Sequence, residues 1–520
     1  MVEVESVQTV EVRRAGRREW IGLAALVVPM MFILLDNGII FLALPQLTEN
    51  LGASSTQILW IADIYGFFLM AFLVAMGRIA DRIGHRRLLL IGAAAFSVLS
   101  LMAAFTTSPV MLIVLRAALG IAGGTVGPSV FAIIRQLFPD RRQMATAMSI
   151  FATSAMIGVA LGPTVGGVLL HWFWPGSVFL IAVPVMLWLL VVGPIALPET
   201  RQRSTAPVDL SSVVLWLSAV LPTIYGVTTL ARVGWAAAPV VAIVVGLALG
   251  TAFVTRERRL PNPLLDMRLF GIRAIGTTLA MFLLVGIVQS GNGLVLNQHL
   301  QLVEGYSTLA TALWMVLPIS VAIGGVHLST MLAKRTRPAF VIGGGLVVAS
   351  VGSAVLSQID AVGGLTTLLV GLCIVMAGTS PVGVLSGQLV MQSAPAEQAG
   401  SAGSLNGTAG ELSSALGIAV FGSLVNVFYS GNVRTPDALS PAAETHANDS
   451  ISHAVAIARD LPTGPAEALV SAARDTFNNA VTNIAALCVV LFLALAVLTV
   501  ATLREIPPIG AKPSPAKRAE

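Results

Sequence analysis

The chain has 520 residues, of which 56% are hydrophobic and only 11% are charged, and its mean hydropathy is +0.87. Soluble globular proteins carry about 25% charged residues, so this composition excludes a soluble protein and indicates helices that cross a membrane. The apolar runs are long and continuous, which excludes a β-barrel with its short alternating strands. The expected fold class is therefore an all-α membrane protein.

Fourteen apolar segments predict 14 transmembrane helices. The first segment follows a cluster of four arginines and continues for about 25 residues, which is too long for the core of a signal peptide, so we expect an uncleaved helix. In chain order, the expected spans are 20–45, 57–77, 87–106, 110–134, 144–170, 177–197, 210–230, 236–255, 273–296, 307–332, 338–357, 364–390, 400–428 and 479–503.

The basic residues predict the orientation of these spans. Of the 30 lysines and arginines, 25 lie in the two tails and in every second loop. The positive-inside rule places both termini in the cytoplasm, which agrees with an even number of spans, and no nucleic-acid partner is needed to explain the basic residues. One long loop, 429–478, then lies outside and is expected to hold short helices near 452–460 and 465–478. It is either a tolerated surface insertion or an extracellular cap over the transport path.

Two short basic turns, 77–87 and 332–338, predict an internal repeat because each is followed by an apolar, glycine-rich helix. If spans 9–14 repeat spans 1–6, spans 7 and 8 are an insertion, and a substrate site between the repeats is typical of secondary transporters. The two cysteines, Cys373 and Cys488, lie in apolar runs and are expected to be small core residues, with no disulfide, metal or cofactor. The predicted units are a cytoplasmic tail at 1–19, a six-helix bundle at 20–200, two inserted helices at 201–260, a second six-helix bundle at 261–504 and a tail at 505–520.

Two aspartates interrupt apolar segments. Asp36 lies within the run from Ile21 to Pro45, and Asp63 lies within the run from Ile58 to Met76. Acids inside a membrane are costly and usually functional, and a carboxyl group in low dielectric can bind and release a proton near neutral pH. The chain is therefore predicted to handle protons, cations or both.

The loop between spans 2 and 3 carries a dense charge pattern. Its glycines allow a tight turn, and Asp81 can pair with nearby arginines in contacts that would be rearranged when two helix bundles rock. The residues of the pattern are Gly77, Asp81, Arg82, Gly84, Arg86 and Arg87. Their spacing resembles the signature loop of the major facilitator superfamily.

Span 5 contains the pattern Gly-Pro-x-x-Gly-Gly. Gly158, Gly162 and Gly166 fall on one ridge, which permits close helix contact, and Pro163 leaves one backbone carbonyl without its helical partner. With Gly167, the pattern resembles the motif that marks antiporters in the same superfamily.

Span 4 contains a lone arginine, Arg116. An arginine inside a membrane is functional by default. Counted from the outer ends of their helices, Asp36 and Arg116 lie at similar depth, so we expect them to be able to pair.

These motifs resemble those of the fourteen-helix drug:proton antiporters of the major facilitator superfamily, and within it the multidrug and antiseptic-cation efflux pumps. The resemblance covers nearly the whole chain. It implies two six-helix bundles with two inserted helices in the plasma membrane, a monomer, and small lipophilic cations and protons as partners. Further residues that carry it are Leu35-Asp36-Asn37, Ala43-Leu44-Pro45 and Leu59-Trp60-Ile61-Ala62-Asp63-Ile64-Tyr65.

Roles follow as hypotheses. Asp36 is the proton-coupling candidate, modulated by Arg116, and Glu411 of span 13 is a candidate for a second proton site and for substrate contact. Asp63 is the other substrate candidate: it shares a helix face with Trp60 and Phe67, and an acid flanked by aromatic rings suits a lipophilic cation. Alternatively, Trp60 belongs to an interfacial aromatic belt and Phe67 faces lipid.

The pattern also departs from some relatives. Span 10 contains no acid, only His327, which could carry protons or satisfy a helix contact. Asn406 occupies a polar position before Glu411. These departures leave open the proton count and the preference for divalent cations.

The sequence thus predicts a proton-coupled antiporter, not an enzyme, that exports hydrophobic and mainly cationic drugs, dyes or antiseptics by alternating access. The chain contains no Gly-x-x-x-x-Gly-Lys-[Ser/Thr] phosphate loop for ATP. Alternatives are an exporter of a specific metabolite or lipid, a non-transporting sensor, for which no signalling domain is appended, and a membrane-embedded enzyme such as a transferase. The scattered histidines offer no clustered catalytic set for an enzyme: His85, His171, His299, His446 and His453.

Overall fold

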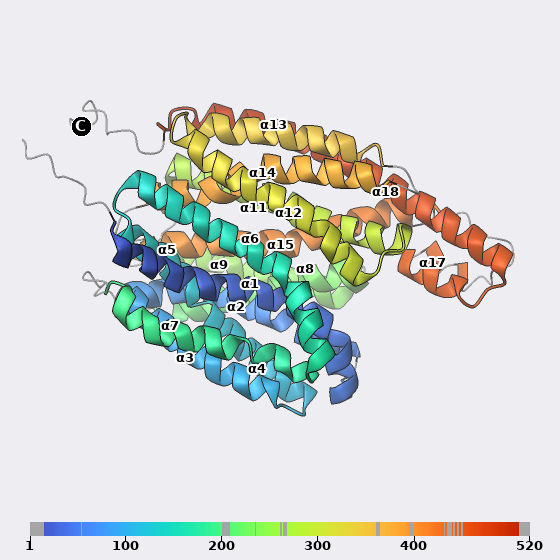
Figure 1. Ribbon diagram of the computed structural model, residues 1–520, viewed down its shortest axis with the longest axis horizontal. Coiled ribbons are helices and arrows are strands. Elements are labelled where there is room, and N and C mark those ends of the chain that lie inside the picture. Colours follow the sequence, from blue (N-terminus) through green and yellow to red (C-terminus); the bar gives the residue numbers. More distant parts are fainter. Residues whose placement is uncertain are drawn as a thin grey trace, which may run out of the picture.

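A computed structural model describes the regular elements of the chain, and within the described residues these are all helices (Figure 1). The described residues are 15–53, 55–199, 209–233, 236–260, 263, 268–359, 364–394, 399–430, 432–433, 439, 443–444, 447–448 and 451–508.

The helices of the first part of the chain lie together in the blue and green part of Figure 1. They are α1 (Arg17–Leu51), α2 (Ser55–Ile83), α3 (His85–Ala104), α4 (Pro109–Gly123), α5 (Val126–Leu137), α6 (Arg141–Trp172), η1 (Pro175–Phe179) and α7 (Ala182–Ala196).

The rest of the chain forms the yellow to red part, with two green helices, α8 and α9, behind it. Its helices are α8 (Leu210–Val233), α9 (Ala237–Glu257), α10 (Arg268–Gly271), α11 (Arg273–Gln298), η2 (His299–Val303), α12 (Thr308–Ala333), α13 (Pro338–Leu356), α14 (Leu365–Ser393), α15 (Ala399–Tyr429), α17 (Ile451–Ala458) and α18 (Thr463–Leu503).

Thirteen helical segments in the described part of the chain are long and apolar enough to cross a membrane. They correspond to every predicted span except the fifth, which is α6. That helix has 32 residues, and at about 1.5 Å per residue it exceeds the roughly 30 Å hydrocarbon core. The multi-pass membrane architecture is confirmed, whereas the count of fourteen and the cytoplasmic position of the termini stay predictions.

The long segment 429–478, which is predicted to lie outside, differs from the expectation in its helices. The predicted short helix near 452–460 is present as α17, but residues 465–478 do not form a second separate helix. They are the beginning of α18, which runs for 41 residues from Thr463 to Leu503. Leu469, Ala473 and Phe477 are fully buried on one face of this extension, and their packing continues the helix past the apolar span. Figure 1 shows α17 and this end of α18 projecting beyond the other helices.

Helix pairing repeats between the two parts of the chain. In the first part α1 packs on α6, α2 on α4 and α3 on α7; in the second, α11 packs on α15, α12 on α14 and α13 on α18. The buried apolar side chains likewise form two clusters, one mainly in each part. This is the packing that two copies of one six-helix unit would have. We refer below to α1–α7 as the first half and to α11–α18 as the second half, and α8 and α9 belong to neither.

The halves meet along two seams. On one seam α6 packs on α12 and α14; on the other α15 packs on α2 and α5. The inserted helix α8 packs on α2, α15 and α9, so it touches one helix of each half.

Candidate functional site

The two charged groups predicted to pair inside the first half lie together. Arg116 Nη1 of α4 is 3.5 Å from Asp36 Oδ2 of α1. Arg116 is 0% exposed and Asp36 is 5% exposed. Because water does not screen the pair, the attraction between the charges is strong, and removing one charge would leave the other uncompensated.

The same guanidinium also holds α2. Arg116 Nε donates to the carbonyl oxygen of Ile61 at 3.2 Å, and Nη2 donates to that of Ala62 at 3.4 Å. The guanidinium carbon lies 4.8 Å from the centre of the Tyr65 ring. One buried side chain therefore joins α1, α2 and α4, and a change in the charge of Asp36 acts directly on the turn of α2 that begins at Ile61.

Tyr65 is a site residue to which sequence reasoning assigned no role. A methyl group placed on Gly120 of α4 would collide with the carbonyl oxygen of Tyr65, and one on Gly123 would lie 3.0 Å from the Tyr65 hydroxyl. That hydroxyl is buried and has no hydrogen-bond partner among the described residues. A tyrosine inside an apolar run was the available signal, because its hydroxyl needs a polar neighbour.

The predicted glycine ridge of α6 packs against the backbone of α1 beside Asp36. A methyl on Gly158 would collide with the carbonyl oxygen of Met31, one on Gly162 would lie 2.9 Å from that of Leu35, and one on Gly166 would lie 3.3 Å from Ile39 Cα. The prediction of close helix contact is confirmed, and the contact fixes the backbone on both sides of the acid. Gly167 follows on α6 and is half-buried, and the side chain of Pro163 lies outside the described part of the structure.

The loop between α2 and α3 turns at Gly84, whose φ of 103° favours glycine. Asp81 is buried, and its Oδ1 lies 3.3 Å from His85 Nε2. Arg87 Nε lies 3.0 Å from Glu199 Oε1, just after α7.

The other residues of this loop differ in their contacts and in how exposed they are. Arg86 donates to the carbonyl oxygen of Leu197 at 3.3 Å, so two arginines of the loop bind the end of α7. Gly77 is buried within α2, and Arg82 is exposed.

The predicted substrate face of α2 points toward the inserted helix α8. The Trp60 ring stacks on Tyr225 of α8, with 5.6 Å between ring centres and 4° between planes. Its edge contact with Phe67 has a centre separation of 6.5 Å. Asp63, between them in sequence, is half-buried and interacts electrostatically with Arg116. Trp60 therefore packs against two aromatic rings, and its role as a substrate contact or as a belt residue stays a prediction.

Glu411 lies on α15, the helix of the second half that packs on both α2 and α8. It is partly buried and interacts electrostatically with Tyr65. Asp36 and Asp63 therefore act electrostatically on Arg116, and Asp36 and Glu411 act on Tyr65.

A cavity of about 270 Å³ lies between the halves. None of the predicted substrate residues lines it within the described structure. Apart from Asn406, which the sequence marked as a polar position, sequence reasoning missed these lining side chains. The lining is mainly apolar and includes an edge-to-face contact between Phe131 and Phe151 at 5.3 Å. The lining residues are Phe131, Met148, Phe151, Ala152, Ala155, Met156, Phe282, Gln289, Val326, Thr379, Ser380, Gly383, Val384, Gly387 and Asn406.

Two polar groups of this lining stand out. Gln289 Nε2 of α11 lies 3.3 Å from the Met376 sulfur of α14. Asn406 is 9% exposed, and its Oδ1 has no hydrogen-bond partner in the described part of the chain. The cavity can therefore take an apolar body with a hydrogen-bond donor.

Polar contacts join the halves on the side of the cavity toward the start of α6 and the end of α12. Gln388 Nε2 donates to the carbonyl oxygen of Ala145 at 3.2 Å, and Lys334 Nζ donates to Thr146 Oγ1 at 2.8 Å. Burial, and to a lesser degree the neighbouring charge of Arg142, lowers the pKa of Lys334.

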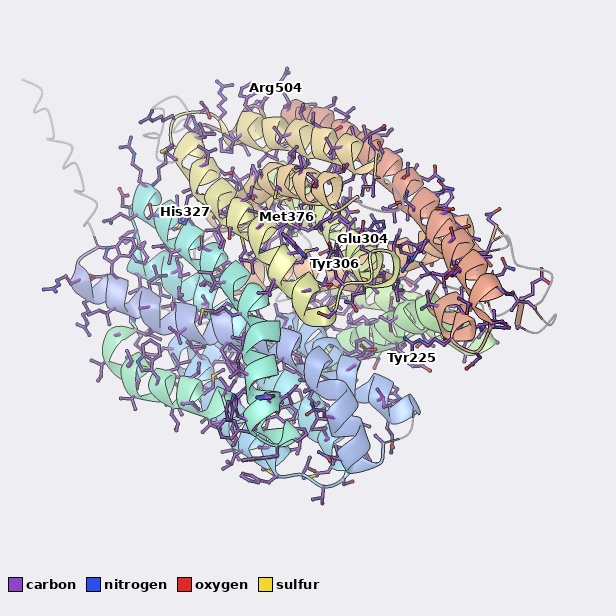
Figure 2. The ribbon with its side chains drawn as sticks, turned by 45° about the vertical axis from the view of Figure 1, so that its right-hand side comes forward. Tyr225, Glu304, Tyr306, His327, Met376 and Arg504 are labelled. Atoms are coloured by element: carbon purple, nitrogen blue, oxygen red, sulfur yellow. The ribbon has the colours of Figure 1, made fainter. Side chains whose placement is uncertain are left out.

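His327 belongs to the same set of contacts. Its Nδ1 lies 3.1 Å from Ser149 Oγ, and its Nε2 lies 3.2 Å from Thr153 Oγ1, so both ring nitrogens contact α6 of the other half. Figure 2 labels His327 on α12 and Met376 on α14. This geometry favours the interpretation of His327 as a helix-contact residue.

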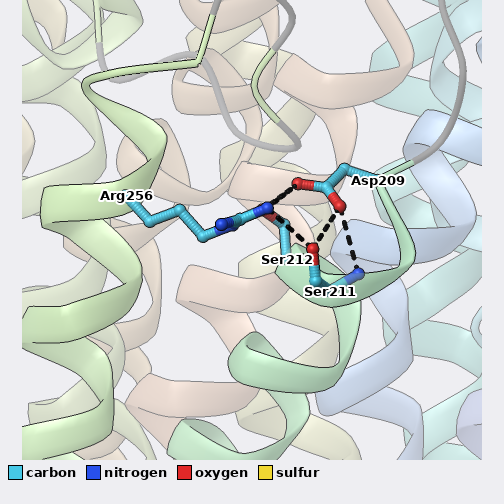
Figure 3. A network of polar contacts seen from close by, with 4 residues as sticks. All are labelled: Asp209, Ser211, Ser212 and Arg256. Carbon is cyan, nitrogen blue, oxygen red and sulfur yellow. Dashed lines mark hydrogen bonds and ion pairs between the residues drawn. The ribbon is translucent and has the colours of Figure 1, made fainter.

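The inserted pair α8 and α9 is joined at one end by a polar network (Figure 3). Arg256 Nη2 donates to Asp209 Oδ2 at 2.8 Å and to Ser211 Oγ at 2.7 Å. Ser212 Oγ donates to the same carboxylate at 3.0 Å. The hydrogen bond from Ser211, and then that from Arg256, holds the pKa of Asp209 well below its usual range.

Comparison with known proteins places this geometry in context. Residues 26–418 match the Major Facilitator Superfamily. The chain is 38% identical to the multidrug efflux pump LfrA of Mycolicibacterium smegmatis, over 93% of this chain and 96% of that protein. It is 32% identical to the methyl viologen resistance protein SmvA of Salmonella typhimurium, over 88% of this chain and 93% of that protein.

The fold itself is similar to a solved structure. The human organic anion transporter MFSD10 superposes with a TM-score of 0.58 at 15% identity, over 91% of this chain and 99% of that chain. At this identity the similarity concerns the fold alone.

Proposed function

Because the chain belongs to the Major Facilitator Superfamily, we propose that it is a proton-coupled antiporter that exports hydrophobic, mainly cationic drugs, dyes or antiseptics across the plasma membrane. The observation that carries the proposal is the buried Asp36–Arg116 pair and its attachment to α2. The names of the related proteins support drug efflux as the activity, and methyl viologen is itself a dication.

Protons act at Asp36 in this proposal. When Asp36 takes up a proton, its attraction for Arg116 falls, while the guanidinium keeps its contacts with Ile61 and Ala62. The link between α1 and α2 is thereby weakened, and proton release restores it. Glu411, near Tyr65 on the opposite half, supplies a second proton site.

The substrate is proposed to bind between the halves. The apolar cavity takes the hydrophobic body, and Asp63 and Glu411, with the rings of Trp60 and Phe67, attract the positive charge. A mainly apolar cavity without charged lining residues suits varied hydrophobic substrates better than one specific metabolite.

Transport would proceed by alternating access. The termini are assigned to the cytoplasm, so the contacts of His327, Lys334 and Gln388 with α6 close the cytoplasmic side. The loop residues Asp81 and Arg87 would change partners as the halves rock. The protein is proposed to act as a monomer. Its units are two helix bundles at 20–200 and 261–504, the inserted pair of helices at 201–260, and tails at 1–19 and 505–520.

The proposal is tested by measuring the uptake of ethidium into inside-out vesicles across which a proton gradient has been established. We expect ethidium uptake that stops when the proton gradient and membrane potential are both collapsed, and we expect Asp36→Asn to abolish ethidium-induced proton flux. Uptake that survives full collapse of both gradients would rule out antiport.

A further inference from the structure

The inserted helix α8 is fixed to α2 by aromatic side chains at two levels. Trp216 Nε1 donates to the carbonyl oxygen of Ala71 at 2.8 Å. Further along, Trp60 and Tyr225 stack with their planes 4° apart. Figure 2 shows Tyr225 on α8, away from His327 and the α6–α12 seam. The inserted pair therefore reaches the α2 face that carries Asp63.

That face of α2 has open space beside the acid. Asp63 lies one helical turn after Trp60, and Gly66 lies three residues further on. A methyl group on Gly66 would meet no atom within 4 Å. Trp60, Asp63 and Phe67 are each only partly buried, so a ligand can reach them.

The second half contributes another acid next to α2. A methyl on Gly407 of α15 would lie 2.7 Å from the Leu73 side chain, so this face of α15 packs on α2. Glu411 lies one turn further along α15 on the same face and acts electrostatically on Tyr65 of α2. The helices α2, α8 and α15 therefore contribute two carboxylates, Asp63 and Glu411, and the aromatic rings of Trp60, Phe67 and Tyr225.

We propose that this region of α2, together with the facing part of α8, binds the flat, positively charged part of the substrate. We call it the α2–α8 site, and Tyr225 of α8 is its specificity-determining contact. The proposal rests on the proposed export of lipophilic cations. It gives the inserted helices a binding role, because α8 supplies a ring face that α2 cannot present alone. The site consists of Trp60, Asp63, Gly66, Phe67, Tyr225 and Glu411.

The test is equilibrium binding of ethidium, a planar cation, to the full chain in lipid nanodiscs, followed by fluorescence anisotropy. Tyr225→Leu keeps an apolar side chain but removes the ring. We expect it to weaken ethidium binding about tenfold, which lies between the losses for an exposed and for a fully desolvated cation–π contact. Tyr225→Phe keeps the ring, and we expect it to bind within about twofold of the unmodified protein.

Two further variants separate recognition from packing. A Cβ at Gly66 meets no atom within 4 Å, so Gly66→Leu starts its side chain in open space. We expect it to weaken ethidium binding while the thermal unfolding temperature is unchanged. Trp216→Phe removes the hydrogen bond to Ala71 at the other level of α8, and we expect it to leave ethidium binding unchanged.

The outcomes are distinct. Unchanged binding in Tyr225→Leu, equal losses in Tyr225→Leu and Tyr225→Phe, or equal losses in Tyr225→Leu and Trp216→Phe would each overturn the α2–α8 site. None of these would affect the antiport proposal, which fails only if the unmodified protein exports ethidium without a proton gradient or membrane potential.

Discussion

The two halves connect equivalent helices with different chemistry. In the first half α1 and α4 are joined by the ion pair of Asp36 and Arg116, whereas in the second half α11 and α14 are joined by the neutral contact of Gln289 with Met376. A neutral contact does not respond to a proton, and an ion pair does. The repeated fold therefore holds one pair of helices together through charges and the equivalent pair through uncharged groups.

The largest effect is expected when one charge of the Asp36–Arg116 ion pair is removed. Asp36→Asn leaves Arg116 buried without its counter-charge, and we expect a loss of stability of about 3 kcal/mol together with loss of substrate-induced proton release. Thermal unfolding and pH-dye measurements on proteoliposomes check the two effects. The matched control is Gln289→Leu in the neutral half, which should keep proton release; if it also abolished release, the halves would not differ as described.

A double variant sharpens the same comparison by giving the first half the chemistry of the second. Asp36→Asn combined with Arg116→Met removes both charges, so we expect stability to return to within about 1–2 kcal/mol of the unmodified protein. Proton coupling should stay absent, because no group at this position can then bind a proton. Recovery of proton release in the double variant would show that Asp36 is not the coupling group.

The glycine contacts test what the halves share. Gly162→Ala places a methyl 2.9 Å from Leu35 O, and Gly417→Ala places one 2.5 Å from Ile287 O in the equivalent pair α11–α15. We expect each to cost about 1–3 kcal/mol in thermal unfolding measurements, as overpacking does. Gly383→Ala is the control, since its methyl meets open space. A cost in only one half would contradict equivalent helix packing.

The smallest effect is expected outside both halves, at the Asp209–Arg256 pair of the inserted helices. The folded-state pKa of Asp209 lies below its unfolded value, so its charge stabilises the protein above the unfolded pKa of about 3.9, and this contribution is lost as the pH falls toward the folded-state pKa. We expect Asp209→Asn to lower stability by about 1 kcal/mol or less at pH 7, because the pair is partly exposed.

The measurement is thermal unfolding as a function of pH. The difference between Asp209→Asn and the unmodified protein should shrink below about pH 4. A difference that grows on acidification would contradict the depressed pKa of Asp209.

The sequence alone determined the membrane class, the positions of the spans and the two buried charges. Apolar runs of about 20 residues need a bilayer, and Asp36 and Arg116 stand out in them because charges there are rare. The glycine ridge was also readable, since Gly158, Gly162 and Gly166 recur at helical spacing.

Only the tertiary structure decided which groups meet across helices far apart in the chain. The contact of Trp60 with Tyr225, 165 positions later in the sequence, left no local pattern, and neither did the cavity side chains Phe131 and Phe151. The continuity of residues 465–478 with α18 was likewise not predictable from their local composition, because it depends on the packing of their buried face. Periodicity and hydropathy are properties of single segments, whereas a site between two halves depends on how those segments pack.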